Sequence, residues 1–417
     1  MRKTLLLSTL AASYIYAGGD IEPQVCKSNI NAPQSITTLA DAFAQGKISG
    51  QIRAGYIWVD PSATAYPQNY TTAIGGVLKY ETAPLYGFSG GVAFYTSHAI
   101  MPLSGDIDEG KFNESMASSD KYYDILGEAY LNYKYDNFNI RIGRQLIDTP
   151  YADSDDIRMT PNTFEGVLAS YEISDFTILG AYLTKWQGPD AEYEFEDLLE
   201  DGDGVAMVAL TYSKDDLEAG MWYYNADNTA DIFYIDASKS FALNDDINTK
   251  ISVQFANQSE IDNSGIDSML YGAMIEFGYK GLNLSVAYDK VDVEDNSAYF
   301  GGFGGGVGYV NMFEMTAGAL ATFEDIDAFK YSIGYDFSSL GCEGLSMTFD
   351  YGDFEGENNH EAKEYNFTLA YAPSSQWDLE IVYDKIDDVH HNLRETPNAT
   401  HIDFSLDRVL VRANYNF

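Results

Sequence analysis

The chain ends on an amphipathic strand, and this ending narrows its fold more than any other segment. From Arg408 to Phe417, apolar and mostly polar side chains alternate, with Val409, Val411, Ala413, Tyr415 and Phe417 on one face. Because successive strand residues point to opposite faces, this alternation predicts a strand with one apolar and one polar face. Outer-membrane β-barrels commonly end on such a strand, with an aromatic residue in last place.

The opposite end of the chain has the features of an export signal. Met1-Arg2-Lys3 is positively charged, the run from Thr4 to Ala12 is apolar, and small residues follow up to Ala17. A short apolar run with these flanks is typical of a cleaved Sec-type signal peptide. We therefore expect export across the inner membrane, with cleavage after Ala17.

The rest of the chain contains no apolar run near the ~20 residues of a transmembrane helix, which leaves a closed barrel as the membrane-spanning fold. Its 33 Tyr and 23 Phe suit the aromatic girdles of such barrels. A Tyr-rich secreted β-sandwich or β-helix is the alternative. We divide the chain into a signal peptide, 1–17, a periplasmic tether, 18–46, in which Thr38 caps a short helix at Leu39–Phe43, and an outer-membrane barrel, 47–417.

Alternating segments recur about every twenty residues along the barrel region. In the first strand Ile52 is predicted to face outward and Arg53 inward, and in the fourth strand Ile125 and Ala129 are predicted to face outward. Eight short turns, rich in Gly, Pro, Asn, Asp and Ser, alternate with nine mostly longer polar segments. The turns lie near Ala83, Asp136, Ser174, Lys214, Asn244, Lys280, Gly341 and Pro373.

Eight turns and nine loops predict an all-β, antiparallel, up-and-down transmembrane barrel of about eighteen strands, with both ends in the periplasm. Sixteen strands are the alternative, because the ninth and tenth are weakly patterned. A barrel this wide cannot be filled by its own side chains, so it holds water or a plug. No separate plug domain is visible in the sequence.

The chain is strongly acidic, with 64 Asp and Glu against 24 Lys and Arg. This balance argues against nucleic acid and anionic membrane surfaces as partners. Much of the excess lies in predicted outer loops such as Asp190–Asp203 and Asp353–Glu364. We interpret these loops as solvated, with divalent cations bridging them to lipopolysaccharide as the second interpretation. No other cofactor is expected.

Strand parity predicts which charges face the lumen. The basic set is Arg53, Arg408 and Arg412, on the first and last strands, and Arg141 on the fifth. The acidic set is Glu276, Asp289, Asp350, Glu364, Asp378, Glu380 and Asp384. This distribution predicts a basic wall and an acidic wall, whose transverse field would orient solutes. The alternative is that these charges only solvate a wet interior.

Two other features of the barrel region carry separate expectations. Arg144 falls outward by parity, so it must lie above the apolar belt or beyond a bulge, since Arg facing lipid at mid-membrane costs roughly 2–4 kcal/mol. Cys26 and Cys342 are both predicted near the periplasmic rim, where disulfides form. The sequence leaves open whether these two cysteines are bonded.

The segment from Gly143 to Gly166 carries a family resemblance. Its run Ser154-Asp155-Asp156-Ile157-Arg158-Met159-Thr160-Pro161-Asn162-Thr163-Phe164-Glu165-Gly166 is similar to a block of OprD-type outer-membrane porins, with one extra Asp. Asp41-Ala42-Phe43 and Gly50-Gln51-Ile52-Arg53 also resemble that family and its epsilonproteobacterial relatives.

This resemblance implies that the third and seventh outer loops fold inward as a constriction and that a ladder of arginines guides small carboxylates. The implied constriction residues are Asp153, Ser154, Asp155, Asp156, Arg158 and Pro161. Arg158 matches the motif directly, whereas Arg53, Arg141 and Arg412 are candidates by parity. The mature chain has only seven arginines, which departs from the family pattern and puts a strict carboxylate preference in doubt.

We therefore expect a water-filled porin in the outer membrane of a Gram-negative bacterium, passing small hydrophilic solutes and ions, among them small carboxylates or amino acids. The alternative is a surface adhesin or structural barrel that binds a partner through its acidic outer loops. A transporter of hydrophobic substrates would need an apolar cleft near the N-terminus, which residues 18–46 do not resemble.

Catalysis is not expected. Ser97 and His98 are the only adjacent serine–histidine pair, and neighbours in a strand point to opposite sides. His390-His391 is insufficient evidence for a metal site. Expected partners are outer-membrane lipid and lipopolysaccharide, small solutes, and the barrel assembly machinery through the strand ending at Phe417. A homotrimer is a further expectation.

Overall fold

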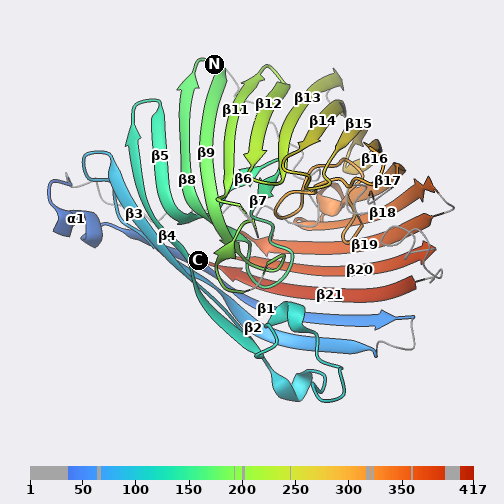
Figure 1. Ribbon diagram of the computed structural model, residues 1–417. Helices are drawn as coiled ribbons and strands as arrows, with labels where there is room; N and C mark the ends of the chain where they lie inside the picture. Colours follow the sequence, from blue (N-terminus) through green and yellow to red (C-terminus); the bar gives the residue numbers. More distant parts are fainter. Residues whose placement is uncertain are drawn as a thin grey trace.

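The computed structural model describes residues 36–62, 67–191, 193–199, 202–244, 246–315, 321, 324–357, 360–389 and 404–417. Over these residues, eighteen long antiparallel strands form one closed barrel (Figure 1). Each long strand pairs with the next along the chain, and β1 (Lys47–Pro61) pairs with β21 (Phe404–Asn416) to close the ring. The predicted fold class and strand count are confirmed.

The other long strands are β2 (Asn69–Glu81), β3 (Phe88–Ala99), β4 (Tyr122–Tyr135), β5 (Phe138–Gln145), β8 (Thr163–Ile173), β9 (Phe176–Gln187), β11 (Val205–Lys214), β12 (Leu217–Ala226), β13 (Ala230–Asn244), β14 (Ile247–Glu260), β15 (Ser268–Tyr279), β16 (Leu282–Val293), β17 (Ile326–Asp336), β18 (Leu345–Gly356), β19 (Glu361–Ser374) and β20 (Trp377–Val389). Short elements are α1 (Leu39–Ala44), η1 (Met101–Leu103), η2 (Glu114–Met116), η3 (Phe337–Leu340), β6 (Asp148–Thr149), β7 (Ala152–Asp153) and β10 (Glu196–Asp197).

The short turns all lie where the sequence places them, at one end of the barrel. Asp136, Ser174 and Lys280 have positive φ values of 50°, 56° and 47°, as the tightest hairpins require. The chain also enters and leaves the barrel at this end, where Gly50 and Phe417 exchange two backbone hydrogen bonds of 3.0 Å. This end is the predicted periplasmic side.

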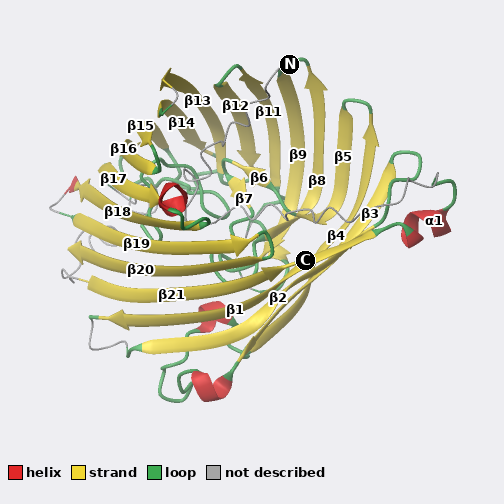
Figure 2. Cartoon of the chain, turned by 180° about the vertical axis from the view of Figure 1, so that it is seen from behind, coloured by secondary structure: helices red, strands yellow, loops and turns green. Residues whose placement is uncertain are grey.

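The short helix α1 lies outside the barrel at the same end (Figure 2). Thr38 caps it by accepting a hydrogen bond from the backbone of Asp41, whose carboxylate in turn accepts from the backbone of Thr38, forming a capping box. Within the described part of the chain, no helix is long and apolar enough to cross a membrane.

One parity prediction is wrong because of a β-bulge in β4. Glu128 pairs with Ala93 and Leu126 with Phe94, so Gly127 is an extra residue. Beyond a bulge the side chains exchange faces. Ile125 is therefore inward and 8% exposed, whereas Leu126 is outward and 46% exposed. Ala129 lies between the bulge and the periplasmic turn, where parity holds, and it keeps its predicted outward position.

Two outer loops occupy the barrel interior (Figures 1 and 2). Loop 3, residues 146–162, contains the β6–β7 hairpin, and loop 7 joins β16 to β17, its described residues being 294–315, 321, 324 and 325. They contact each other through backbone hydrogen bonds from Asp153 to Phe303 (2.8 Å) and from Phe303 to Tyr151 (3.0 Å). Tyr151, Phe303 and Met312 belong to an apolar cluster inside the barrel. The core of this molecule thus lies in the lumen, between inward loops and the wall.

Candidate functional site

Loop 3 is tied to the barrel wall through Arg53 on β1. The Arg53 guanidinium is fully buried and makes two hydrogen bonds to the Asp156 carboxylate, of 2.6 and 2.7 Å. It also donates to the carbonyl of Arg158 (2.8 Å) and to the side chain of Asn414 on β21 (2.7 Å). This bidentate geometry is among the stronger charge-assisted arrangements in proteins. Arg53 therefore anchors loop 3.

Arg412 reinforces this anchor from the neighbouring strand β21. It pairs with Glu380 on β20 at 2.6 Å and donates to the backbone carbonyl of Asp156. Burial acts to raise the pKa of Asp156, but the charge and hydrogen bonds of Arg53 and the charge of Arg412 outweigh it. They hold the pKa of Asp156 below its usual value. The carboxylate that fastens loop 3 thus stays ionised over the physiological range.

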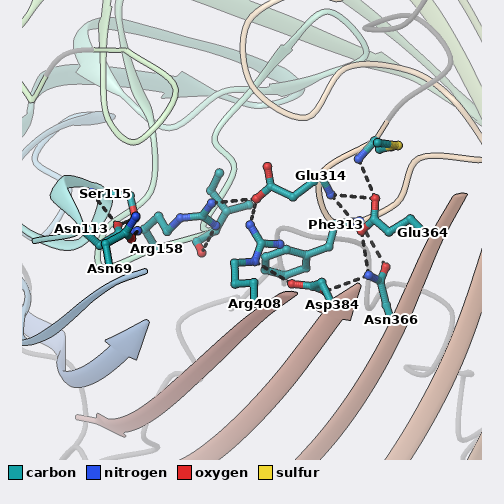
Figure 3. Close-up of polar contacts among 12 residues, drawn as sticks. Asn69, Asn113, Ser115, Arg158, Phe313, Glu314, Glu364, Asn366, Asp384 and Arg408 are labelled. Carbon is teal, nitrogen blue, oxygen red and sulfur yellow. Dashed lines mark hydrogen bonds and ion pairs between the residues drawn. The ribbon is translucent and has the colours of Figure 1, made fainter. Parts of the chain in front are cut away.

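A second cluster joins loop 7 to both loop 3 and the wall (Figure 3). The Glu314 carboxylate of loop 7 lies between two arginines: its Oε1 is 3.1 Å from Arg158 Nη2 and also contacts Arg408 Nη1. Both guanidinium groups lie over the ring of Phe313, with centroid distances of 5.8 and 4.2 Å. Arg408 also pairs with Asp384 at 2.6 Å.

Acidic residues of the wall hold the backbone of loop 7. Glu364 on β19 accepts hydrogen bonds from the amides of Glu314 (3.1 Å) and Met315 (2.8 Å), and Asn366 donates to both Glu364 and Asp384 at 2.7 Å (Figure 3). Farther around the barrel, Asp289 is fully buried. It accepts from the side chain of Gln254 (2.8 Å) and from the amide of Val310 in loop 7 (2.9 Å).

The predicted separation into a basic and an acidic wall needs correction. Glu380 stands directly opposite Arg412, and Asp384 opposite Arg408, in the β20–β21 register. Asp378 likewise accepts hydrogen bonds from Asn414 and Asn416 on β21. Strand parity correctly predicted that these side chains face the lumen. It did not predict that each arginine of β21 would lie directly beside a carboxylate of β20. Their fields therefore largely cancel at short range.

The remaining predicted residues lie elsewhere. Arg141 packs against the ring of Tyr130 at 4.1 Å and bonds to Asn132, outside both arginine clusters. Asp350 on β18 stands opposite Ser332 on β17. Ser154 and Pro161 belong to loop 3; the Ser154 hydroxyl accepts from the amide of Ile147 (2.9 Å), and the Pro161 carbonyl accepts from Gln187.

Arg144 and the cysteines can also be placed in part. Arg144 pairs with Glu165 at 2.9 Å and packs against the ring of Phe195 at 4.0 Å, near the outer end of β5. Cys342 is exposed in the turn between β17 and β18. Cys26, residues 1–17 and His390-His391 lie outside the described residues, so the disulfide and the signal peptide stay predictions.

A cavity of about 690 Å³, which we call the passage, lies between loop 3, loop 7 and the inner faces of β12–β15. Among the described residues that line it, eight are acidic and two are basic. The acidic residues are Asp148, Asp153, Asp155, Asp190, Glu218, Asp236, Glu276 and Glu314, and the basic ones are Arg158 and Lys250. Of the arginines singled out in the sequence, Arg158 lines this passage with 9% of its surface exposed, whereas Arg53, Arg141, Arg408 and Arg412 do not line it.

The acidity of the passage depends on protonation. Burial, followed by the negative charges of Asp153, Asp190 and Asp156, raises the pKa of Asp155 to about 8, although Arg158 opposes this shift. Burial also raises the pKa of Asp190. Near neutral pH, Asp155 is therefore poised to change its charge inside the constriction.

On the wall side of the passage, sequence reasoning found Glu276 on β15 and missed three other charged residues. Glu218, Asp236 and Lys250 alternate inward on β12, β13 and β14, and strand parity could have found them. The contact between loops 3 and 7 also depends on a glycine. Gly304 has a φ of +97°, and a Cβ there would approach the carbonyl oxygen of Asp153 to 2.3 Å, so only glycine permits this close approach of the two loops.

Comparison with known proteins places the chain in a family. The model of outer membrane porins of the OprD family matches residues 105–390, whereas no curated protein sequence matches significantly. The fold is similar to crystal structures of Acinetobacter baumannii OccAB3 (17% identity, 90% of this chain and 100% of that chain, TM-score 0.76) and Pseudomonas aeruginosa OccK8, also called OprE (16%, 91% and 100%, TM-score 0.71).

A third similar structure is Pseudomonas aeruginosa OpdK with vanillate (15% identity, 89% of this chain and 99% of that chain, TM-score 0.73). At these identities the structural likeness establishes the fold, and the family match over residues 105–390 establishes the family. The chain belongs to the OprD family of outer-membrane porins, the channels for small solutes in the outer membrane of Gram-negative bacteria.

Proposed function

We propose that this porin passes small hydrophilic solutes passively and favours cations and solutes bearing an ammonium group over free carboxylates. The observation that carries this proposal is the lining of the passage, with eight carboxyl groups against Arg158 and Lys250. A pore lined by acidic side chains concentrates cations and repels anions. Asp155 is mostly protonated at neutral pH because its pKa is raised to about 8. The other seven carboxyl groups of the lining still outnumber the two basic side chains.

The buried arginines support the same preference. OpdK was crystallised with vanillate, which is a carboxylate. In this chain Arg53 is engaged by Asp156, Arg412 by Glu380, and Arg408 by Asp384 and Glu314. An arginine paired in this way is electrically compensated and is a poor attractor for a passing anion. The carboxylate preference implied by the family resemblance is therefore not the one we propose.

The family match favours a channel over the adhesin alternative. Diffusion through the passage requires no covalent step and no cofactor, so we propose neither. The homotrimer, the recognition of the Phe417 strand by the barrel assembly machinery, and divalent cations bridging the outer loops to lipopolysaccharide stay predictions. The pairing of Phe417 with Gly50 at the closing seam supports a role of the last strand in assembly.

Planar-bilayer recording of the purified barrel under a KCl gradient tests this function. We expect stable open steps and a reversal potential of the sign for potassium preference. A barrel that is folded by its heat-modifiable gel mobility but does not conduct would contradict the channel and support the adhesin. Open steps with chloride preference would contradict the cation preference alone.

A further inference from the structure

Glu314 occupies the position that a bound solute carboxylate would take. Its carboxylate lies between the guanidinium groups of Arg158 and Arg408 (Figure 3), and it is 36% exposed at the edge of the passage. A carboxylate bridging two arginines over an aromatic ring, here Phe313, is a common way for proteins to hold an anion. In this chain the anion belongs to loop 7.

The two arginines retain unused hydrogen-bonding capacity. Within the described residues, Arg158 Nε and Arg408 Nη2 are buried N–H groups without a hydrogen-bond partner. Arg408 is 3% exposed and Arg158 is 9% exposed. Buried donors without partners are costly, so Glu314 and Asp384 leave the hydrogen-bonding capacity of both guanidinium groups partly unsatisfied.

Glu314 is the ion-pair partner that the two arginines share. Arg158 pairs with Glu314, and Arg408 pairs with Glu314 and Asp384. Glu364 is held by backbone amides and by Asn366, farther along the same cluster. Removing the charge of Glu314 therefore leaves Asp384 as the one direct ion-pair partner of these two arginines among the described residues.

We infer that Glu314 is a built-in counter-ion that masks a carboxylate-binding site formed by Arg158, Arg408 and Phe313. The inference rests on the proposed channel function and deepens it. While Glu314 stays in place, solute carboxylates are excluded from the site. Replacing its carboxylate by a neutral group removes the anion that both guanidinium groups hold, and a small carboxylate from the passage then binds them in its place.

Loop 7 should keep its position when the side chain of Glu314 changes. The main-chain amides of Glu314 and Met315 are held by Glu364, and these hydrogen bonds do not use the Glu314 carboxylate. Lys330 on β17 also donates to the carbonyl of Asn311 in the same loop, at 3.1 Å. Glu314→Gln removes the negative charge but none of these main-chain hydrogen bonds, so the two arginines lose their shared counter-ion with the loop still attached.

The experiment measures current block by sodium benzoate in planar bilayers for the wild type, Glu314→Gln and Glu218→Gln. The last is a matched control, because Glu218 also lines the passage but contacts neither arginine. We expect the half-blocking benzoate concentration to fall at least roughly tenfold in Glu314→Gln. Glu218→Gln removes one carboxylate from the same lining, so we expect only a small fall in its half-blocking concentration, well short of tenfold, and a small change in reversal potential.

The double variant Glu314→Gln/Arg158→Ala should lose the block again. Equal benzoate sensitivity in wild type and Glu314→Gln, with both barrels folded and conducting, would overturn the masking role of Glu314. Block in Glu314→Gln that survives removal of Arg158 would overturn the site. A folded wild type that does not conduct would instead overturn the channel function. If Glu314→Gln fails to fold by gel mobility, Glu314→Ala takes its place in the same comparison.

Discussion

At the scale of single residues, burial decides what an arginine does. Arg53 and Arg158 carry the same charge, but Arg53 is fully buried behind loop 3 whereas Arg158 faces the passage. The first anchors loop 3, and the second lines the passage beside Glu314. Inward parity alone does not separate these roles, because it says nothing about what lies between a side chain and the water.

Arg53→Ala is expected to destabilise the barrel by about 3–5 kcal/mol, because it leaves the buried Asp156 carboxylate without its main partner. Urea unfolding of the refolded protein in detergent, followed by tryptophan fluorescence, measures this loss. Arg53→Lys serves as the control, since it keeps the charge but not the two parallel hydrogen bonds. An unchanged unfolding midpoint in Arg53→Ala would contradict the anchoring role.

Asp155 should make cation selectivity depend on pH. Its pKa is raised to about 8 by burial and by Asp153, Asp190 and Asp156, so it is mostly protonated at pH 6 and ionised at pH 9. We expect the reversal potential to shift toward potassium over this interval. In Asp155→Asn the reversal potential should change much less between pH 6 and pH 9. The same pH dependence in this variant as in the wild type would mean that other groups titrate over this interval.

At the scale of elements, the alternation of apolar and polar residues predicts where strands lie, but it does not predict β-bulges or the course of loops. The turns and the outward faces follow from side-chain periods that lie within one segment. The bulge at Gly127 does not, because it depends on the register with β3. The inward course of loops 3 and 7 was expected only from the family resemblance, since turn-rich loops look alike whether they point outward or inward.

A buried histidine connects three elements at the outer rim. His360, before β19, pairs with Glu324 at the end of loop 7 and with Asp388 on β20, at 2.5 and 3.0 Å. Burial acts to lower its pKa, but the hydrogen bonds that the ring donates to Asp388 and Glu324, with their negative charges, prevail and raise the pKa to about 9. The folded state thus binds this proton more tightly than the unfolded chain does.

A raised histidine pKa stabilises the fold fully below the unfolded value of about 6.5, and this contribution is lost as pH rises through about 9. We expect the unfolding midpoint in urea to fall between pH 7 and pH 10. His360→Gln should be less stable at pH 7, with a weaker dependence over this interval. A parallel pH dependence in both proteins would argue against His360 as the titrating group.

At the scale of the whole molecule, closure turns distant residues into neighbours. Arg53 and Asn414 meet only because β1 pairs with β21, and the passage exists only where two inward loops leave the lumen open. The pore is therefore a property of loop placement within the ring. The eighteen strands alone would enclose a much wider channel.

The sequence by itself determined the barrel, its strand count, its periplasmic turns and the family motif around Arg158, because these depend on local periods and local turn chemistry. Only the tertiary structure decided which inward charges meet the solute. Arg53, Arg408 and Arg412 share one face with the charges of the passage, but loops distant in sequence cover them and pair with them. Accessibility and charge compensation arise from contacts across the ring, and these contacts leave no periodic signal in the chain.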